Sequence, residues 1–374
     1  MFGKIGWGPR KNVKTTSRDL VELERRVRGK SDRDPEAWRT LADAYAESGD
    51  AAGVYHALRM RADLLPDNAA AARECGVAAR KAGALHEALD HFDRSLAIDP
   101  KAASTHSQRA KVLDLLGRVA EAYEGHQRAI DLAPESAPCR YHLGVTEARH
   151  GRTADAIHSY EEALRLDPSF ARAHGNLGVL LDREGAFERA TVALRRAITL
   201  EPRRAEWHSN LGALYGEHKM YTEAIEEFGV ALRLDPDNAE ARFNLGIAYL
   251  DCSEYDDAVE HLRAATEVAP RNPQSFYYLG EAYQKKGLYA KAVRALKDTL
   301  AITPDDARCY YSLGCVYNKM DSVEDAITSF ERSIALDPDN GRAYYHLGIA
   351  YDKKGASHEA RDAYRRSEEL LAGT

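Results

Sequence analysis

Prolines recur at a fixed interval of 34 residues along almost the whole of this 374-residue chain. They lie at positions 66, 100, 134, 168, 202, 236, 270, 304 and 338. Such a period, within roughly 20–50 residues, is typical of chains built from stacked copies of one small unit. Because proline cannot continue a helix, the interval predicts one helix-ending turn per unit. This repetition replaces the usual expectation of two or three globular domains for a chain of this length.

Other positions keep the same register when the proline is numbered 32 in each unit. Ten units then fill residues 35–374, starting at residues 35, 69, 103, 137, 171, 205, 239, 273, 307 and 341. Position 8 is Gly in eight units and Ala in two, position 20 is Ala in nine, position 7 is Leu in eight and position 11 is Tyr in six. Glycine inside a helix costs about 1 kcal/mol relative to alanine. Its recurrence at one position therefore predicts two helices packed closely together, with positions 7 and 11 facing the next unit.

Polar residues mark the ends of the predicted helices. Position 32 closes the second helix of each unit, and the next helix opens on a capping side chain at Asn68, Ser136, Asn238, Asp306 and Asn340. His106, His174 and His208 all occupy position 4, where we expect them to pack within a unit and not to bind a metal. Arg109 and Glu147 occupy the core positions 7 and 11, and either they pair across a unit boundary or both side chains reach solvent.

The combined pattern Leu-Gly-x-x-Tyr, Ala, aromatic, Pro at period 34 resembles the tetratricopeptide repeat family. The resemblance implies an all-α fold, a right-handed α-solenoid (superhelix) of ten helix-turn-helix repeats whose first helices form the inner wall. Pentatricopeptide RNA binders have a neighbouring period. Glycine at position 8, proline at position 32 and the charge of −12 over residues 35–374 argue against that family and against nucleic acid as a partner.

The residues before the first repeat differ from the array in charge and pattern. Residues 1–34 carry a net charge of +5. Within residues 16–34, Leu20, Leu23 and Val27 form a narrow apolar stripe that predicts a helix capping the first repeat. Residues 1–15 are predicted to be a basic flexible arm. It could be an unstructured tail, a docking peptide, a segment folded onto the acidic repeats, or, through residues 1–14, a membrane tether.

Position 6 of the first helices is predicted to contact a ligand. It holds Asn176, Asn210 and Asn244 in three consecutive repeats, with Gln108 earlier in the chain. An amide offers both a donor and an acceptor, so a ladder of them can bind the main chain of an extended peptide. The ladder resembles that in the repeat arm of O-linked N-acetylglucosamine transferases, here without their catalytic domain. Alternatively, asparagine is simply common at this position in the family.

Aromatic residues at position 5 predict a second element of the same surface. Four consecutive repeats place Phe243, Tyr277, Tyr311 and Tyr345 there, with Tyr278 alongside at position 6 and Arg308 and Arg342 at position 2. Aromatic side chains dominate binding hot spots, so this half of the array suits a peptide with apolar and acidic residues. Packing between repeats is the alternative explanation.

No motif predicts chemistry. The chain has no phosphate loop, Gly-x-Ser-x-Gly or His-Glu-x-x-His, and its five cysteines follow no metal or disulfide spacing. We therefore expect no enzyme activity, cofactor or metal, and with no long apolar stretch a cytoplasmic protein. The predicted function is a scaffold or adaptor that binds a peptide or partner protein in the groove. The alternative is a targeting or regulatory subunit that docks to an enzyme, a membrane or itself through the basic arm or an open C-terminal edge.

Overall fold

The protein is described by a computed structural model over residues 17–30 and 32–372. These residues form twenty-one α-helices and no strand, which confirms the all-α class. The helix α1 (Ser17–Lys30) precedes the array, and the arm of residues 1–15 lies outside the described residues. The chain divides into two compact units, Met1–Leu180 and Leu181–Thr374, with the division inside α10.

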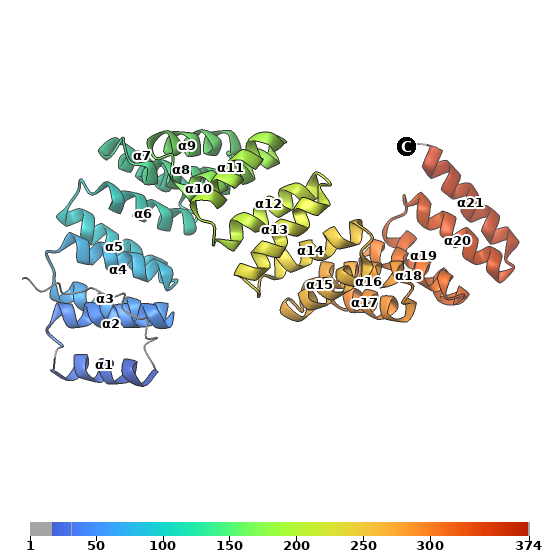
Figure 1. The fold of residues 1–374 in the computed structure, drawn as a ribbon, viewed down its shortest axis with the longest axis horizontal. Coiled ribbons are helices and arrows are strands. Elements are labelled where there is room, and N and C mark those ends of the chain that lie inside the picture. The colour runs from blue at the N-terminus through green and yellow to red at the C-terminus, as the bar shows by residue number, and fades with distance from the viewer. Residues whose placement is uncertain (1–16, 31, 373–374) are drawn as a thin grey trace, which may run out of the picture. The chain divides into compact units, whose positions relative to one another are not determined.

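Each repeat consists of two antiparallel helices, which pack on each other in every repeat that lies within one unit (Figure 1). The first helices are α2 (Pro35–Ser48), α4 (Ala69–Lys81), α6 (Ala103–Leu115), α8 (Ala137–Arg149), α10 (Ala171–Arg183), α12 (Ala205–Glu217), α14 (Ala239–Asp251), α16 (Pro273–Lys285), α18 (Ala307–Lys319) and α20 (Gly341–Lys354). The second helices are α3 (Ala51–Leu64), α5 (Leu85–Ile98), α7 (Val119–Leu132), α9 (Thr153–Leu166), α11 (Phe187–Leu200), α13 (Tyr221–Leu234), α15 (Tyr255–Val268), α17 (Tyr289–Ile302), α19 (Val323–Leu336) and α21 (Ser357–Ala372). Every first helix thus begins at the first residue of a counted repeat.

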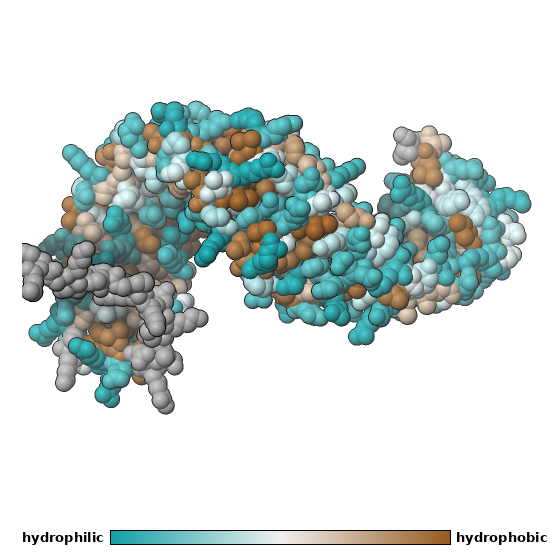
Figure 2. Space-filling view, viewed as in Figure 1, coloured by the Kyte–Doolittle hydropathy of each residue, from teal (hydrophilic) through white to brown (hydrophobic). Residues whose placement is uncertain are grey.

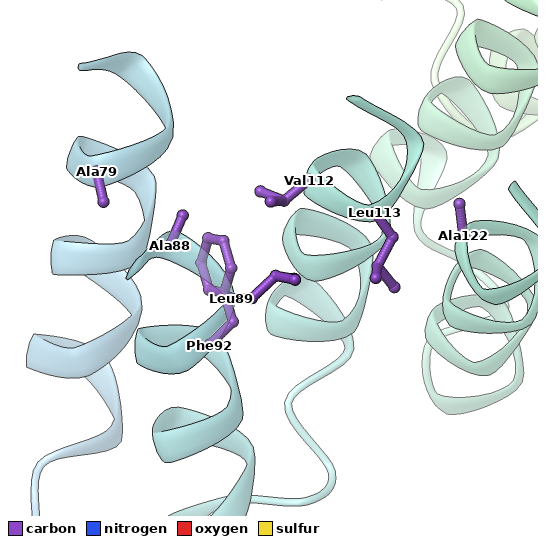
Figure 3. Packing of buried hydrophobic residues seen from close by; sticks show 7 residues of the cluster. All are labelled: Ala79, Ala88, Leu89, Phe92, Val112, Leu113 and Ala122. Carbon is purple, nitrogen blue, oxygen red and sulfur yellow. The ribbon is translucent and has the colours of Figure 1, made fainter. Parts of the chain in front are cut away.

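Glycine at position 8 lies against the large side chain at position 24 of the same repeat. A Cβ added to Gly76 would come within 2.7 Å of Phe92 Cε1. Figure 3 shows the Phe92 ring between α4 and α5, with Leu89 directed toward Val112 on the next repeat. Each glycine therefore makes room for a buried ring or Leu that joins the two helices of its repeat.

The two repeats with alanine at position 8 place a glycine on the opposite helix instead. In the third repeat, a Cβ on Gly125 would lie 3.0 Å from Ala110 Cβ. In the first repeat, a Cβ on Gly53 would lie 2.4 Å from Tyr45 Cδ1. Close approach of the two helices is therefore retained, while the helix that supplies the small residue changes.

The turn between the two helices of a repeat requires a left-handed backbone at position 15. Seven repeats have glycine there with φ between 73° and 83°, whereas Lys219, Ser253 and Asp321 hold φ of 60°, 64° and 56°. Left-handed backbone is strained for residues with a Cβ. The glycines at position 15 were a turn signal that the sequence analysis overlooked.

Helix-capping side chains and the histidines at position 4 form hydrogen bonds at the turn between repeats. Asn68, Asn238, Asp306 and Asn340 accept a main-chain N–H as predicted, but Ser136 makes no such bond, so its prediction as a side-chain cap was wrong. The Nε2 atoms of His106, His174 and His208 lie 3.0, 3.1 and 3.3 Å from the carbonyl oxygen of the preceding position-32 proline. These histidines therefore bind the turn before their own helix, in agreement with a packing role.

Helix α1 packs on the first repeat through the predicted stripe. Val27 is buried, and Leu20 and Leu23 pack partly buried against a cluster that includes Trp38 and Leu41. The apolar side of the first repeat is thereby covered by a helix that does not belong to the array, as terminal repeats generally need.

Arg109 and Glu147 do not pair with each other. Arg109 Nε donates to Asp93 Oδ1 at 2.6 Å, on α5 of the preceding repeat. Glu147 is buried and accepts from Ser159 Oγ, also at 2.6 Å. The pairing hypothesis was wrong because each charge has another partner on a second helix. For Arg109 this is the second helix of the preceding repeat, and for Glu147 it is that of its own repeat. Glu147 does not reach solvent either.

Candidate functional site

The first helices of neighbouring repeats form one continuous side of each unit, called here the first-helix face. In the first unit α4 contacts α6 and α6 contacts α8, and in the second unit contacts link α12, α14, α16, α18 and α20 in order. Second helices of neighbouring repeats have no comparable contacts among the described residues. The first helices are therefore closer together, so the first-helix face is the inner side of the local curve within each unit.

A pocket of about 460 Å³ opens on the first-helix face of the first unit. Its walls come mainly from α2, α4 and α6 and include Arg73, Glu74 and Gln108. The side-chain oxygen Oε1 of Gln108 is buried and has no hydrogen-bond partner within the described chain. The predicted contact residue Gln108 thus lies in a pocket with an unused acceptor.

The three predicted ladder asparagines have different surroundings. Asn176 Nδ2 lies 3.3 Å from the hydroxyl oxygens of both Tyr141 and Tyr160, so its amide already has partners within the chain. The half-buried Asn210 makes no side-chain hydrogen bond to the described residues. Asn244 lines a pocket and is also half-buried. The ladder is therefore not uniform, since one of its three amides also links neighbouring repeats.

The pocket beside Asn244 has a volume of about 250 Å³ and is formed by α12, α13 and α14. Gly216 opens it, because a Cβ built on that residue would meet no atom within 4 Å. Glu217 and Asp251 stand in the same wall. Unlike the position-8 glycines, Gly216 leaves empty space on the first-helix face and is not needed for helix packing.

Phe243, Tyr277 and Tyr278 form a first aromatic group on α14 and α16. The Tyr278 ring lies 5.6 Å from that of Phe243 and 5.4 Å from that of Tyr277, both edge-on. All three are half-buried, and Tyr277 Oη lies 3.3 Å from Ser312 Oγ on the next repeat. Burial raises the pKa of Tyr277 to about 12, which keeps its hydroxyl protonated at neutral pH. These rings both join repeats and keep part of their surface open.

Tyr311 and Tyr345 form a second group with His346. The His346 ring lies 5.7 Å from Tyr311 and 5.5 Å from Tyr345. Tyr311 packs against the buried cluster around Phe330, whereas Tyr345 is 49% exposed. Burial raises the pKa of Tyr311 and lowers that of His346, so both are neutral at physiological pH. Of the predicted aromatic strip, Tyr345 has the largest accessible area.

The two predicted arginines stand beside these rings. The Arg308 guanidinium is 5.4 Å from the centre of the Tyr277 ring, and its Nη2 is 3.4 Å from Asp306 Oδ2. Arg342 is exposed, and its charge lowers the pKa of Tyr311 against the larger effect of burial. Hydrophobic residues reach the visible surface in separate patches among hydrophilic ones (Figure 2).

Across residues 17–30 and 32–372, no three His, Cys, Asp or Glu side chains are grouped as metal ligands. Within the same residues, no helix has both the length and the apolar character required to cross a bilayer.

The helix pairs and their contacts define an α-solenoid of helical-hairpin repeats. Family models described as tetratricopeptide repeats match residues 48–103, 141–202, 187–239, 217–275, 253–313 and 341–370, and one described as a TPR repeat matches residues 316–355. Together these matches cover well over half of the chain, which belongs to the tetratricopeptide repeat family. A search of curated protein sequences finds no match.

Several solved structures are similar to part of the chain. A crystal structure of MamA is 29% identical over 44% of this chain and 95% of its own, with a TM-score of 0.42. YrrB, described as a TPR protein with an unusual peptide-binding site, is 23% identical over 49% of this chain and 95% of its own, with a TM-score of 0.45. PilF from Pseudomonas aeruginosa is 22% identical over 60% of this chain and 98% of its own, with a TM-score of 0.49. Because these TM-scores are below 0.5, no inference about function follows from them.

Proposed function

We propose that the protein is a non-catalytic scaffold whose first-helix face binds an extended peptide segment of a partner protein. The observation that carries this proposal is the pocket at Asn244. It opens on the first-helix face, an amide stands in its wall, and a helical glycine keeps it empty without any packing need. An amide can bind peptide main chain whatever the peptide sequence.

The aromatic groups extend this surface along the second unit. Tyr345 and the half-buried rings of Phe243, Tyr277, Tyr278 and Tyr311 offer apolar contact area with little loss of side-chain freedom, because packing already holds most of them in place. Exposed guanidinium groups at Arg308 and Arg342 add positive charge beside the rings. We therefore propose that Asn210, Asn244, these rings and these arginines contact the peptide, with Gln108 contributing in the first unit and Asn176 in part.

A matched pair of glycine substitutions tests the proposal without weakening the fold. Gly216→Leu fills the pocket from a position where a Cβ meets no neighbour. Gly229→Leu makes the same change on the second helix of the same repeat, where only Arg233 Nη1 lies near, at 3.6 Å. Both replace a helical glycine, so neither is expected to lower the melting temperature.

The measurement is a selection of random linear peptides on the full-length chain, followed by affinity measurements on the two variants. We expect a group of selected peptides to bind Gly216→Leu about tenfold more weakly than wild type, while Gly229→Leu binds them normally. The proposal is rejected if no linear peptide is selected, or if every selected peptide binds both variants equally.

A further inference from the structure

Four basic residues follow one diagonal across the first helices of the first unit. They are Arg80, Lys111, His142 and Arg172, at positions 12, 9, 6 and 2 of consecutive repeats. Lys111 follows Arg80 by 31 residues, and His142 follows Lys111 by the same interval, which is three short of the period. We call this set the basic diagonal.

Residues related by this interval touch each other on the first-helix face. Lys111 Nζ lies 3.0 Å from His142 Nε2, and Arg73 Nη1 lies 2.9 Å from Ser104 Oγ, again 31 residues later. Arg80 stands in the same relation to Lys111. Both Arg80 and Arg172 are close enough to act electrostatically on Lys111 and on His142.

The basic diagonal has no acidic counterpart among the residues that the structure describes. Within the described residues, no carboxylate forms an ion pair with Arg80, Lys111 or Arg172. Burial lowers the pKa of Lys111 to about 8, and the charges that add to this effect, Arg80 and Arg172, are both positive. Buried charges are ordinarily paired with an opposite charge. The half-buried Arg80 and Lys111 therefore lack the partner that would stabilise them, whereas Arg172 is exposed.

Unused hydrogen-bond groups surround the same place. Lys111 donates to Nε2 of His142, whose pKa burial lowers to about 3, so the neutral ring carries its proton on Nδ1. That Nδ1 is buried without a partner, as are Arg80 Nε and the acceptor Gln108 Oε1. A buried donor without an acceptor is costly. A carboxylate placed here would supply the opposite charge and an acceptor together.

We propose that Arg80, Lys111, His142 and Arg172 form a subsite of the first-helix face that binds the carboxylate of an acidic side chain in the partner peptide. This inference rests on the proposed peptide-binding function and specifies the chemistry of the peptide. The subsite takes one residue from each of four consecutive repeats, cations at Arg80, Lys111 and Arg172 and a neutral ring at His142, and Lys111 occupies position 9. The subsite therefore differs from a carboxylate site made by a lysine and an asparagine at positions 5 and 9 of one repeat. No repeat of this chain contains that pair.

The test pairs a change in the protein with a change in the peptide. Lys111→Met keeps the length of the side chain and removes its charge, and Lys101→Met is the matched control in the exposed turn before the same helix. Peptides are selected on the full-length wild-type chain from a random linear library. For each selected peptide that contains Asp or Glu, the acid is replaced by its amide, which leaves the folding of the protein unaffected.

The proposal predicts that the amide peptide binds wild type and Lys101→Met about tenfold more weakly than the acidic peptide, while Lys111→Met binds both equally. The proposal is overturned if the amide peptide loses as much affinity for Lys111→Met as it does for wild type. It is also overturned if none of the selected peptides loses affinity when its acid is replaced by the amide. Peptides that lose affinity on Gly216→Leu but never depend on Lys111 reject this inference alone. A selection that yields no peptide rejects the peptide-binding function as well. The melting temperature of Lys111→Met, expected to be no lower than that of wild type, verifies folding.

Discussion

At the scale of single residues, the glycines of the first helices have two distinct roles. Gly212, at position 8 of α12, lies where a Cβ would come within 2.9 Å of Phe228. Gly216, one turn further on the same helix, has open space around it. The first is required by packing, and the second only shapes a surface.

This difference predicts opposite effects of the same substitution. Gly212→Ala should reduce the free energy of unfolding by about 1–2 kcal/mol, because the clash with the Phe228 ring exceeds the gain in helix propensity. Gly216→Ala should raise it by about 0.5 kcal/mol, since only the propensity gain remains. Urea unfolding of both variants measures the contrast. Equal effects of the two substitutions would contradict the assigned roles.

Lys111 gives a pH-dependent prediction at the same scale. Its folded pKa of about 8 is below the ordinary lysine value of 10.5. Between these values the unfolded chain binds more protons than the folded chain, so this group makes the fold more stable as pH rises. Below pH 8 the charged lysine destabilises the fold, by about 2 kcal/mol.

We therefore expect Lys111→Met to be more stable than wild type by about 2 kcal/mol near pH 7, and by less near pH 9.5. Comparing the two proteins at each pH cancels the titration of other groups, including the tyrosines. Denaturant unfolding at both pH values gives the difference. If the difference in unfolding free energy between the two proteins does not decrease with rising pH, Lys111 has an ordinary pKa.

At the scale of helices and turns, the left-handed residue at position 15 determines the reversal inside each repeat. Ser253 has φ of 64° in this turn, where glycine is better tolerated. Replacing it with glycine should stabilise the protein by about 0.5 kcal/mol, because relief of strain outweighs the greater freedom of glycine in the unfolded chain.

The reciprocal change, Gly287→Ser at φ of 77°, should destabilise the protein by about 1 kcal/mol. Thermal unfolding of both variants checks the pair, and similar shifts of the same sign would exclude backbone strain as the cause. Asp321 occupies the equivalent place but binds Lys353, so it is a poorer test.

Most of the helical framework could be predicted from the sequence, because the same residues recur at the same positions. Proline recurs nine times at position 32, alanine nine times at position 20 and glycine eight times at position 8. The surface was harder to predict. The amide of Asn176 is shared with Tyr141 and Tyr160, and the latter lies on the preceding second helix. The contact of Lys111 with His142 depends on an interval of 31 residues that emerges only once the helices are placed beside each other.

At the scale of the whole molecule, the repeats are held together by contacts between neighbours. Within each unit, helix pairs pack internally and against the next pair, and the described residues show no contacts between distant repeats of the same unit. Stability of such an array is approximately a sum of repeat terms and nearest-neighbour terms. Damage to one repeat should therefore remain local.

Gly314→Ala tests this locality. Its Cβ would come within 2.6 Å of Phe330 Cε1 in the ninth repeat. Native-state hydrogen exchange should show faster exchange in α18 to α21, while α2 to α5 keep the wild-type rates. An equal acceleration in α2 to α5 would mean that the array unfolds as a single cooperative body.

We expect the peptide to contact the first-helix face and not the second helices. Site-specific photo-crosslinking on the full-length chain tests it most directly, with benzoylphenylalanine in place of Asn210 or Tyr345 on first helices and of Val192 on the second helix α11. Val192, the control position, is 70% exposed and Tyr345 is 49% exposed, so accessibility alone would favour crosslinking at Val192. We predict that peptides selected on wild type crosslink at Asn210 or Tyr345 and not at Val192. Crosslinking at Val192 with none at the two first-helix positions would show that the peptide does not bind the first-helix face.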